Sequence, residues 1–346
     1  MEPLPPVRLL RGDAVALEPI EWLWNGYLPA GMLVLLGGAP GCGKTTLALS
    51  LAAVVTTAGV WPDGSKCTDA GDVIIWSGED PPPVIAARLV AAGADMKRVH
   101  FVYGLAGEGA RAFDPGRDMV SLQATLQGLA APRLLILDPI VSAVAGDGHK
   151  SNEVRRALQP VIELGQRLGC TIVGITHFSK GTGGRDPVER ITGSLAFAAQ
   201  ARLVLVAAKG RADGEERRVV VRAKSNVGPD EGGFAYQLKR VDVADGVVGQ
   251  CVEWLGAVDG SAREILSALD GADDERDGPR SDIEAFIRGC FAGGPITSKQ
   301  FEADARGAGY EPRTVQRMAK RMGASSRKDG MRGGWTWHLD TLGSGN

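Results

Sequence analysis

The sequence predicts an α/β fold in which a mostly parallel, twisted β-sheet is flanked by helices, followed by a small C-terminal module. Three observations lead to this prediction. From Met32 onward, short apolar runs alternate with helix-length segments, which is the pattern of βαβ units. A glycine-rich loop follows the first of these runs. An acidic, glycine-rich segment later separates this region from a basic C-terminal one.

Each expected strand is a short apolar run, and each expected helix lies between two such runs. The strands are expected at residues 32–37, 72–77, 99–103, 134–138, 171–176, 201–207 and 218–223. The helices are expected at residues 44–58, 82–93, 119–130 and 152–168. Gly169 is a C-cap signal at the end of the last helix. The runs 234–238 and 247–254 follow turn signals and indicate an antiparallel extension of the sheet.

The glycine-rich loop fits the P-loop pattern G-x-x-x-x-G-K-[ST] and lies between an expected strand and an expected helix. Its free N–H groups and the positive end of the helix dipole bind phosphate. Lys44 would reach the β- and γ-phosphates, and the Thr45 hydroxyl would ligate Mg²⁺. We therefore expect ATP and Mg²⁺ as cofactors. The predicted nucleotide site consists of Gly38, Ala39, Pro40, Gly41, Cys42, Gly43, Lys44, Thr45 and Thr46.

The strand Leu134 to Asp138 has the form of a Walker B strand, four aliphatic residues followed by a carboxylate that supports Mg²⁺. The next residue is Pro139, where AAA+ proteins place a glutamate that polarises the attacking water. The general base must therefore come from another strand. Glu79 follows the strand 72–77 at the edge where open α/β sheets place their ligands, so we expect Glu79 to be the base. Asp80 as the active acid, or Glu79 as a solvated turn residue, are the alternatives.

His177 directly follows the expected strand 171–176 and so lies at the same edge. A polar residue there can sense the γ-phosphate and pass its loss to the glycine-rich loop 181–187, which contains Arg185. A structural or solvated histidine is the alternative interpretation.

Composition divides the chain into four parts. We expect a Pro-rich arm at 1–19, the α/β domain at 20–258, an acidic linker at 259–280 and a C-terminal domain at 281–346. In residues 20–31, which lead into the first strand, the aromatic side chains either pack in the core or cover the nucleotide base.

The C-terminal domain is predicted to contain helices at 281–291, 298–308 and 312–322, followed by a hairpin at 327–339. In this hairpin Trp335, Trp337 and Leu339 alternate onto one face, and three helices with such a hairpin describe a winged helix-turn-helix. Residues 312–332 hold seven Lys or Arg against one acid, although the whole chain has a net charge of −2. Such a local cluster is typical of a nucleic-acid footprint, and a merely solvated helix face is the alternative. The expected DNA contacts are Arg313, Arg317, Lys320, Arg321, Arg327, Lys328 and Arg332.

The chain is of ordinary globular composition, with 44% hydrophobic and 23% charged residues. No apolar run approaches the roughly 20 residues of a membrane span, and the N-terminus lacks the features of a signal peptide. We expect a cytoplasmic protein that does not enter a membrane. Five scattered cysteines without C-x-x-C spacing favour reduced thiols over disulfides or zinc.

Four motifs together resemble the RepA-type hexameric replicative helicases of plasmids and phages, within the RecA-like group that also includes DnaB helicases and RadA. The likeness spans residues 20–255, and its motifs are residues 38–45, 77–82, 134–139 and 176–180. It implies a RecA-like core, a hexameric ring, DNA as partner through the loop with Arg185, and a replication initiator or primase as a further partner.

The same resemblance implies an arginine that completes the site of a neighbouring subunit. Arg202 best matches that position, and an exposed charge at a strand start is the alternative. Lys224 resembles the first member of the K-x-R pair of DnaB-like motors, but Asn226 replaces the second, which leaves Lys224 as a helper.

The resulting hypothesis is a ring-forming ATP hydrolase that moves on DNA, a RepA-like replicative helicase. A RadA-like recombination or repair ATPase and an ATP-switched DNA-binding regulator remain as alternatives.

Overall fold

The structure, a computed structural model, divides into two units, Met1–Ala268 and Leu269–Asn346. The described residues are 9–107, 110–144, 150–178, 186–190, 195–212, 215–273, 279–291, 294–308, 310–328 and 335–339.

Among these residues, the first unit is built on a nine-stranded sheet with the order β13-β12-β11-β10-β3-β9-β8-β4-β5. The strands from β10 to β5 run parallel, and β11, β12 and β13 extend the sheet in antiparallel fashion. The bounds are β3 Leu33–Gly38, β4 Asp72–Ser77, β5 Val99–Phe101, β8 Pro132–Asp138, β9 Thr171–Ile175, β10 Leu203–Ala212, β11 Glu215–Ser225, β12 Gly233–Ala244 and β13 Val247–Val258. The predicted α/β fold with a mostly parallel sheet is confirmed.

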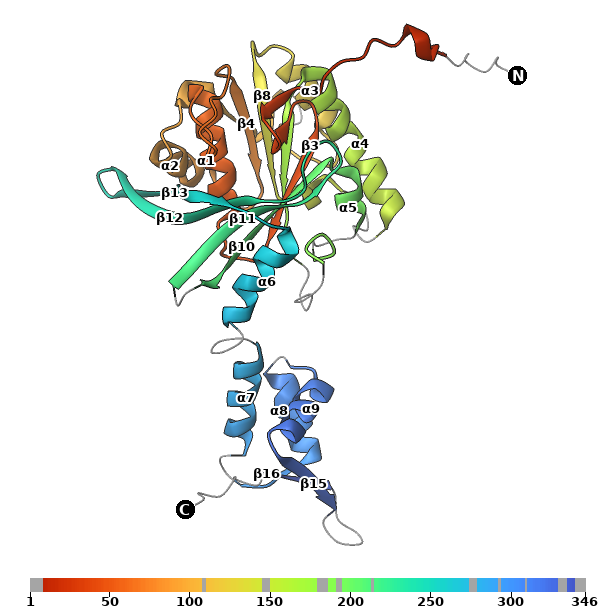
Figure 1. Cartoon of the computed structure of the whole chain (residues 1–346), viewed down its shortest axis with the longest axis vertical. Helices are drawn as coiled ribbons and strands as arrows, with labels where there is room; N and C mark the ends of the chain where they lie inside the picture. The colour runs from red at the N-terminus through yellow and green to blue at the C-terminus, as the bar shows by residue number, and fades with distance from the viewer. Residues whose placement is uncertain are drawn as a thin grey trace. The chain divides into compact units, whose positions relative to one another are not determined.

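Helices cover both faces of this sheet, with α1 and α2 on one side and α3, α4 and α5 on the other (Figure 1). Their bounds are α1 Lys44–Thr57, α2 Pro82–Ala91, α3 Met119–Leu126, α4 Ser151–Leu168 and α5 Leu195–Gln200. Helix α4 has one apolar face, because Val154, Leu158, Val161 and Leu164 recur at helical spacing and are all fully buried. Gly169 ends it in the left-handed conformation that favours glycine.

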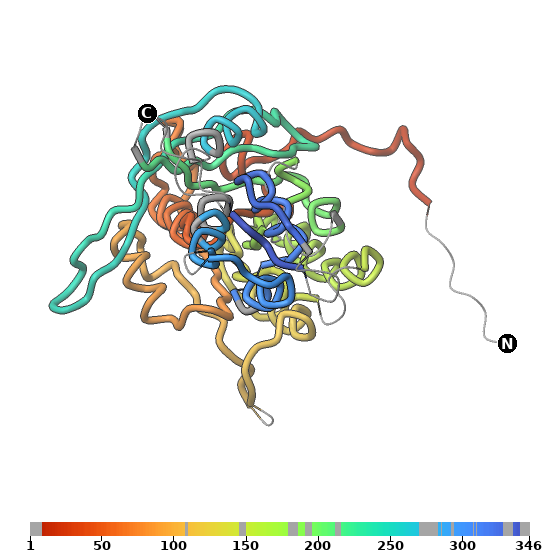
Figure 2. The backbone as a smooth tube through the Cα atoms, turned by 90° about the horizontal axis from the view of Figure 1, so that it is seen from below, coloured from red at the N-terminus to blue at the C-terminus, as the bar shows by residue number. Residues whose placement is uncertain are grey.

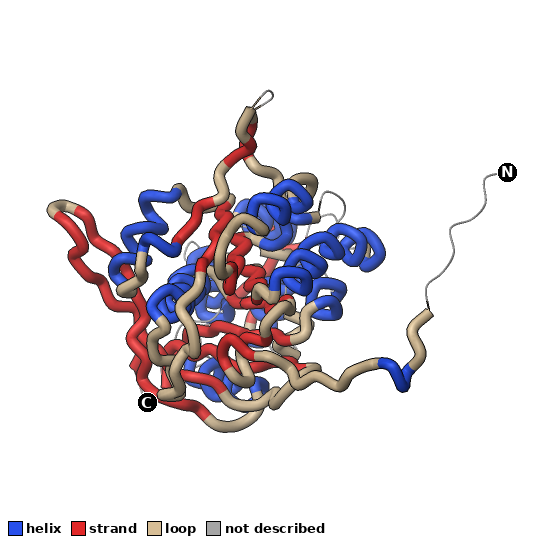
Figure 3. Tube along the Cα trace, turned by 90° about the horizontal axis from the view of Figure 1, so that it is seen from above, coloured by secondary structure: helices blue, strands red, loops and turns tan. Residues whose placement is uncertain are grey.

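The hairpin of β12 and β13 folds over α1 and α2 and extends past them (Figures 1 and 3). Helix α1 is thus enclosed between the sheet and the hairpin. This position explains why its own buried residues, most of them apolar or small, lie on all sides of the helix.

Short elements complete the first unit: η1 Gly12–Ala14, β1 Trp22–Trp24, β2 Leu28–Pro29, η2 Met96–Arg98, β6 Gly104–Leu105, β7 Arg111–Ala112 and η3 Ile140–Ala143. Trp24 and Tyr27 of the segment before β3 are buried, and their rings stack with centroids 4.1 Å apart. These aromatic side chains therefore pack in the core. The described part of the N-terminal arm, residues 9–20, leaves the body of this unit as an exposed segment (Figure 2).

Helix α6 (Ala262–Asp273) occupies part of the segment expected to be an irregular linker. Ala262, Leu266 and Leu269 are buried along one side of it. Its start is a capping box: the Ser261 hydroxyl accepts a hydrogen bond from the Glu264 N–H, and the Glu264 carboxylate accepts one from the Ser261 N–H. The motif S-x-x-E was present in the sequence and would have predicted this helix.

In the second unit, three helices surround a small sheet with the order β14-β16-β15. The bounds are α7 Pro279–Cys290, β14 Ile296–Thr297, α8 Ser298–Gly307, α9 Pro312–Arg321, β15 Ala324–Lys328 and β16 Trp335–Leu339. Its core includes Ile287, Phe301, Val315 and Trp337. Of the residues expected to share one face of the hairpin, Trp337 is 4% exposed, whereas Trp335, the first residue of β16, is 55% exposed.

None of the helices in the described ranges combines the length and apolar character needed to cross a membrane.

Candidate active site

The P-loop joins the end of β3 to the start of α1, as the sequence predicted. Two of its positions require glycine. A Cβ atom at Gly38 would lie 2.2 Å from the carbonyl oxygen of Ala207 on the adjacent strand β10. Gly43 caps α1 with a φ of +95°, a value that side chains other than glycine rarely tolerate. The loop therefore approaches its neighbouring strand closely and presents the N-terminus of α1 at the sheet edge.

Lys44 lies inside this loop and is only 5% exposed. Its Nζ donates hydrogen bonds to the carbonyl oxygens of Gly38 and Ala39, both at 3.1 Å, and lies 3.1 Å from Nδ1 of His177. Burial lowers the pKa of the Lys44 ammonium, and the nearby Cys42, Asp138 and Glu79 act in the opposite direction. The ammonium is thus held by acceptors that phosphate oxygens can replace.

Thr45 and Asp138 form the second element of the site. The Thr45 hydroxyl donates a 2.7 Å hydrogen bond to Oδ2 of Asp138, which is 3% exposed at the end of β8. The pKa of the Asp138 carboxyl is raised, mainly by burial and also by the negative charge of Glu79. The hydrogen bond from Thr45 acts in the opposite direction.

These two oxygens suit Mg²⁺, which prefers hard oxygen ligands and takes its remaining ligands from phosphates and water. The described residues contain no group of three or more His, Cys, Asp or Glu that could hold a metal by itself.

Glu79 lies in a short turn after β4, next to the Walker B strand. The Ser77 hydroxyl accepts hydrogen bonds from the N–H groups of Glu79 (3.3 Å) and Asp80 (3.0 Å). The Gly78 N–H donates to the carbonyl oxygen of Asp138, which ties the turn to β8. The Glu79 side chain is 51% exposed, so it can reach a water molecule at the open side of the site.

Asp80, the alternative acid, is engaged elsewhere. Its Oδ2 accepts a 2.8 Å hydrogen bond from Nη1 of Arg88 on α2. A carboxylate that is engaged with a guanidinium is less available to a water molecule, which favours Glu79 as the base.

His177 connects the two halves of the site. It follows β9, where the flanking N–H groups of Thr176 and Phe178 donate to the carbonyl oxygens of Leu36 and Gly38 on β3. Its Nδ1 faces Lys44, and its Nε2 lies 3.4 Å from Oε1 of Glu79. The ring thus stands between the phosphate-binding lysine and the expected base, where a γ-phosphate sensor would have to be.

A groove of about 600 Å³ lies between α2 and the β12–β13 hairpin, and no P-loop residue lines it. The hairpin is attached to the P-loop region at two points: the Tyr236 hydroxyl donates to the carbonyl oxygen of Cys42 at 2.6 Å, and the Thr46 hydroxyl donates to Oε1 of Gln250 at 3.3 Å. Gln250 also lines the groove, together with Arg88 and Arg240. Sequence reasoning missed these groove residues, because they belong to elements far from the P-loop in sequence and carry no motif.

Arg202 and Lys224 lie at the opposite edge of the sheet. Arg202 precedes β10 and is bound by its backbone to Leu33, at the start of β3. Five residues of strand separate that level from Gly38, roughly 16 Å at 3.3 Å per residue. Arg202 therefore lies well away from the P-loop of its own chain.

Lys224 lies close to Arg202 but is differently engaged. Its Nζ donates hydrogen bonds to the carbonyl oxygens of Ala198 (2.7 Å) and Ala201 (3.1 Å) at the end of α5. Burial lowers the pKa of the Lys224 ammonium, and the charge of Arg202 lowers it further. In this structure the Lys224 ammonium therefore caps the C-terminal end of α5 in its own chain. The Arg202 side chain is exposed, and among the described residues it has no hydrogen-bond or ion-pair partner.

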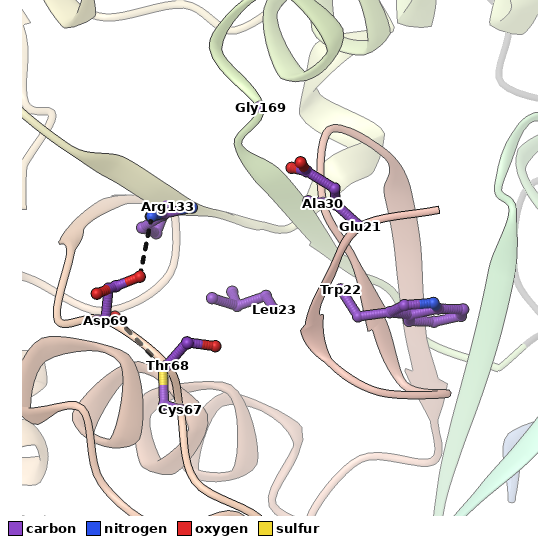
Figure 4. A pocket seen from close by; sticks show the side chains of 9 residues that line it. All are labelled: Glu21, Trp22, Leu23, Ala30, Cys67, Thr68, Asp69, Arg133 and Gly169. Carbon is purple, nitrogen blue, oxygen red and sulfur yellow. Dashed lines mark hydrogen bonds and ion pairs between the residues drawn. The ribbon is translucent and has the colours of Figure 1, made fainter. Parts of the chain in front are cut away.

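A small cavity at this same edge is not a ligand site (Figure 4). It has a volume of about 50 Å³ and is lined by Glu21, Leu23, Asp69 and Arg133, among others. Ligand pockets usually have volumes of roughly 300–1,000 Å³, so this cavity is too small for a nucleotide.

Apart from Arg185, the basic residues predicted to contact DNA belong to the second unit. Arg313, Arg317, Lys320 and Arg321 are exposed on α9, opposite the buried Val315 and Ala319. Arg327 and Lys328 belong to β15. Arg185 and Arg332 lie outside the described residues.

The comparisons with known proteins agree with this geometry. A family model, AAA_25, described as an AAA domain, matches residues 2–183, more than half of the chain. The chain belongs to the AAA_25 family. With its P-loop, Walker B strand and mostly parallel sheet, this AAA_25 protein is a RecA-like P-loop ATPase.

One solved structure with a similar fold is that of a KaiC-like protein from the archaeon Pyrococcus horikoshii. It is 17% identical, with a TM-score of 0.46, and the match covers 67% of this chain and 93% of that one. No curated protein matches the chain.

Proposed function

We propose that this AAA_25 protein is a ring-forming, Mg²⁺-dependent ATPase that acts on DNA, as a replicative helicase of the RepA type. The observation that supports ATP turnover is the convergence of Lys44, Thr45, Asp138, Glu79 and His177 at one sheet edge. The observation that supports DNA as the partner is the exposed basic face of α9 in a unit of three helices and a β-hairpin.

In the proposed reaction, the P-loop N–H groups bind the β- and γ-phosphates, and Lys44 exchanges its contacts with carbonyl oxygens and His177 for phosphate oxygens. Thr45 and Asp138 would hold Mg²⁺, which when bound neutralises negative charge on the phosphates. Glu79 accepts a proton from the attacking water. The base and ribose are proposed to extend from the P-loop toward the groove between α2 and the β12–β13 hairpin, because Gln250, which lines that groove, accepts a hydrogen bond from Thr46.

His177 would report the state of the site. When Lys44 moves to the γ-phosphate, Nδ1 of His177 loses its nearest donor, while Nε2 still faces Glu79. In the proposed motor, this change at His177 would couple the arrival and loss of the γ-phosphate to movement on DNA.

The α9 surface is proposed to read the DNA backbone. Because the basic residues lie opposite the buried side of the helix, they can contact phosphates without disturbing the core of the unit. Four phosphate contacts would give a slope of log affinity against log salt of about −3.6 on duplex DNA, at roughly −0.9 per contact.

Strand displacement with ATP on forked, 5′-tailed and 3′-tailed duplexes, together with native mass determination, tests the helicase proposal. A ring that separates strands supports it. DNA-stimulated ATP hydrolysis and strand exchange without unwinding would favour a RadA-like recombination ATPase instead. ATP-dependent binding to one DNA sequence, without movement, would favour the regulator.

Salt titration of DNA binding tests the α9 surface in the full-length protein. The variant Arg317→Glu/Lys320→Glu should bind DNA more weakly and with a shallower salt slope, while ATP hydrolysis without DNA stays unchanged. Arg98→Glu, which changes an exposed arginine of the first unit, is the matched control. Unaltered DNA binding in the double variant would remove α9 from the proposal.

A further inference from the structure

The hairpin of the second unit carries an exposed tryptophan, Trp335, at the start of β16. Its neighbour two residues along the strand, Trp337, is buried and packs against the ring of Phe301. Because side chains alternate along a strand, both tryptophans belong to the face of the hairpin that packs on the core. The core ends before Trp335, and among the described residues its side chain has no hydrogen-bond, aromatic or cationic partner. A large apolar ring therefore continues this face into solvent.

The surroundings of Trp335 are basic. It comes just after the segment 312–332, which holds seven Lys or Arg against one acid. Lys328 is paired with Trp335 in the register of β15 and β16. Lys320, an exposed residue in the last turn of α9, has its Nζ 6.0 Å from the centre of the Trp337 ring. The basic face of α9 therefore meets the hairpin on the side that carries the two tryptophans.

An exposed aromatic ring beside positive charge fits a nucleic acid that offers an unpaired base. Proteins bind single strands by combining cations that follow the backbone with aromatic rings on which bases stack. A base inside a duplex is already stacked, so an indole reaches it only by separating two base pairs, which costs free energy. A protein partner is a poorer match, because the centres of protein interfaces are depleted in charged residues.

We propose that the Trp335 ring stacks on the first unpaired base at a junction between duplex and single-stranded DNA, while the basic face of α9 holds the backbone of the adjoining duplex. Trp335 lies two residues along β16 from Trp337, roughly 7 Å at 3.3 Å per residue, so one DNA end can contact both the ring and Lys320. This inference rests on the proposed binding of DNA by α9 and adds which form of DNA the second unit selects.

The test measures the affinity of the full-length protein, without ATP, for a blunt duplex and for the same duplex with a short single-stranded tail. Trp335→Thr removes the ring but keeps a residue that favours strands. Its affinity for the tailed duplex should fall about tenfold, within the range found when a stacking partner of a base is removed, while that for the blunt duplex stays within threefold. Trp335→Phe should keep both affinities. Tyr103→Thr, which removes an 81% exposed ring of the first unit, is the matched control.

Two further measurements distinguish stacking from a structural role. Stacking neutralises no phosphate, so Trp335→Thr should keep the wild-type slope of log affinity against log salt on the tailed duplex. A shallower slope would show that phosphate contacts were lost and would count against stacking. The fluorescence of 2-aminopurine at the first unpaired position should fall when wild type binds and should change less with Trp335→Thr.

The proposal is overturned if Trp335→Thr binds the tailed duplex within threefold of wild type. An equal loss of affinity for both probes also overturns it, because the ring would then serve the fold or contact paired bases. A wild-type protein that binds neither probe would instead refute the proposed action on DNA, so the two failures are distinguishable.

Discussion

The two edges of the parallel sheet in the first unit carry opposite kinds of residue. The carboxyl edge brings together residues that end or follow four neighbouring strands, namely Lys44, Asp138, His177 and Glu79. Lys44 lies within hydrogen-bonding distance of His177, and His177 within hydrogen-bonding distance of Glu79. Asp138 is hydrogen-bonded to the residue that follows Lys44. At the amino edge, the Arg202 side chain is exposed and has no side-chain partner among the described residues. One edge thus holds the groups proposed to bind phosphate and to act as base, and the other holds an exposed arginine without a side-chain partner among the described residues.

This difference indicates how assembly with another copy could complete the active site. The carboxyl edge supplies Lys44 from one side of the expected γ-phosphate, and Arg88, near the turn that carries Glu79, is paired with Asp80. Arg202 is roughly 16 Å away along β3 in the same chain and cannot reach the other side of that phosphate. We propose that Arg202, at the amino edge of another copy, brings an arginine to that position.

The largest expected effect is therefore that of Arg202→Ala. If Arg202 completes the site of a neighbouring subunit, its loss should lower kcat by about 10³-fold, the smaller end of the range for arginine fingers. Steady-state hydrolysis measures this effect, and Arg211→Ala, an exposed arginine at the far end of β10, is the control.

Mixed assemblies test whether Arg202 acts across the interface. Doping Arg202→Ala subunits into Glu79→Gln rings should restore some hydrolysis, since some interfaces regain an intact base and an intact arginine. Inactivity of every mixture, with subunit exchange demonstrated, would contradict the assignment.

Glu79→Gln should have the next largest effect, at the carboxyl edge. A missing general base typically costs 10²-fold or more in kcat, whereas ATP binding should persist because Lys44 and the P-loop are untouched. Lys44→Ala should instead lose binding. Turnover in Glu79→Gln within about threefold of wild type would show that the base is another residue.

Lys224→Met should affect stability rather than phosphate chemistry. The ammonium donates to two carbonyl oxygens that end α5, and charged hydrogen bonds contribute about 1.5–3 kcal/mol when buried. Because Lys224 is only partly buried, we expect a loss of about 1–2 kcal/mol, or roughly 2–8 °C in melting temperature. Arg202→Ala should leave the melting temperature unchanged, so this measurement distinguishes the roles of the two residues at this edge. An unchanged melting temperature in Lys224→Met would argue for a role across the interface instead.

Asp138→Asn should give the smallest effect, a rise of a few degrees in the melting temperature of the nucleotide-free protein. Burial raises the pKa of Asp138 above its ordinary 3.8, so the folded state binds its proton more tightly than the unfolded chain. The wild-type protein then loses stability as the pH rises through the folded-state pKa and Asp138 loses its proton. Asparagine does not ionise, so the variant does not lose this stability. The advantage of the variant should therefore grow from acidic to neutral pH in thermal melts. An advantage that shrinks over this range would refute the buried-charge explanation.

Where sequence reasoning fell short, the missing information was mostly spatial. The P-loop and Glu79 were predictable because each follows a strand whose direction and position in a parallel sheet the pattern indicates. The Walker B strand was predictable because it is itself such a strand. The link from Asp80 to Arg88 was not, because an ion pair across a turn depends on side-chain geometry. Helix α6 was predictable in principle from Ser261 and Glu264, but the acidic composition that follows favoured a linker.

What the sequence determined by itself is the local chemistry: a glycine wherever the backbone passes too close for a side chain, as at Gly38, and a polar residue at the end of each buried strand, as at Asp138 and His177. The tertiary structure alone decided which of these groups share a site. Tyr236 and Gln250 reach the P-loop because the β12–β13 hairpin folds over α1, and Lys224 ends α5 because β11 turns back beside β10. Such contacts join residues that lie from 26 to more than 200 positions apart, and packing rather than local pattern brings them together.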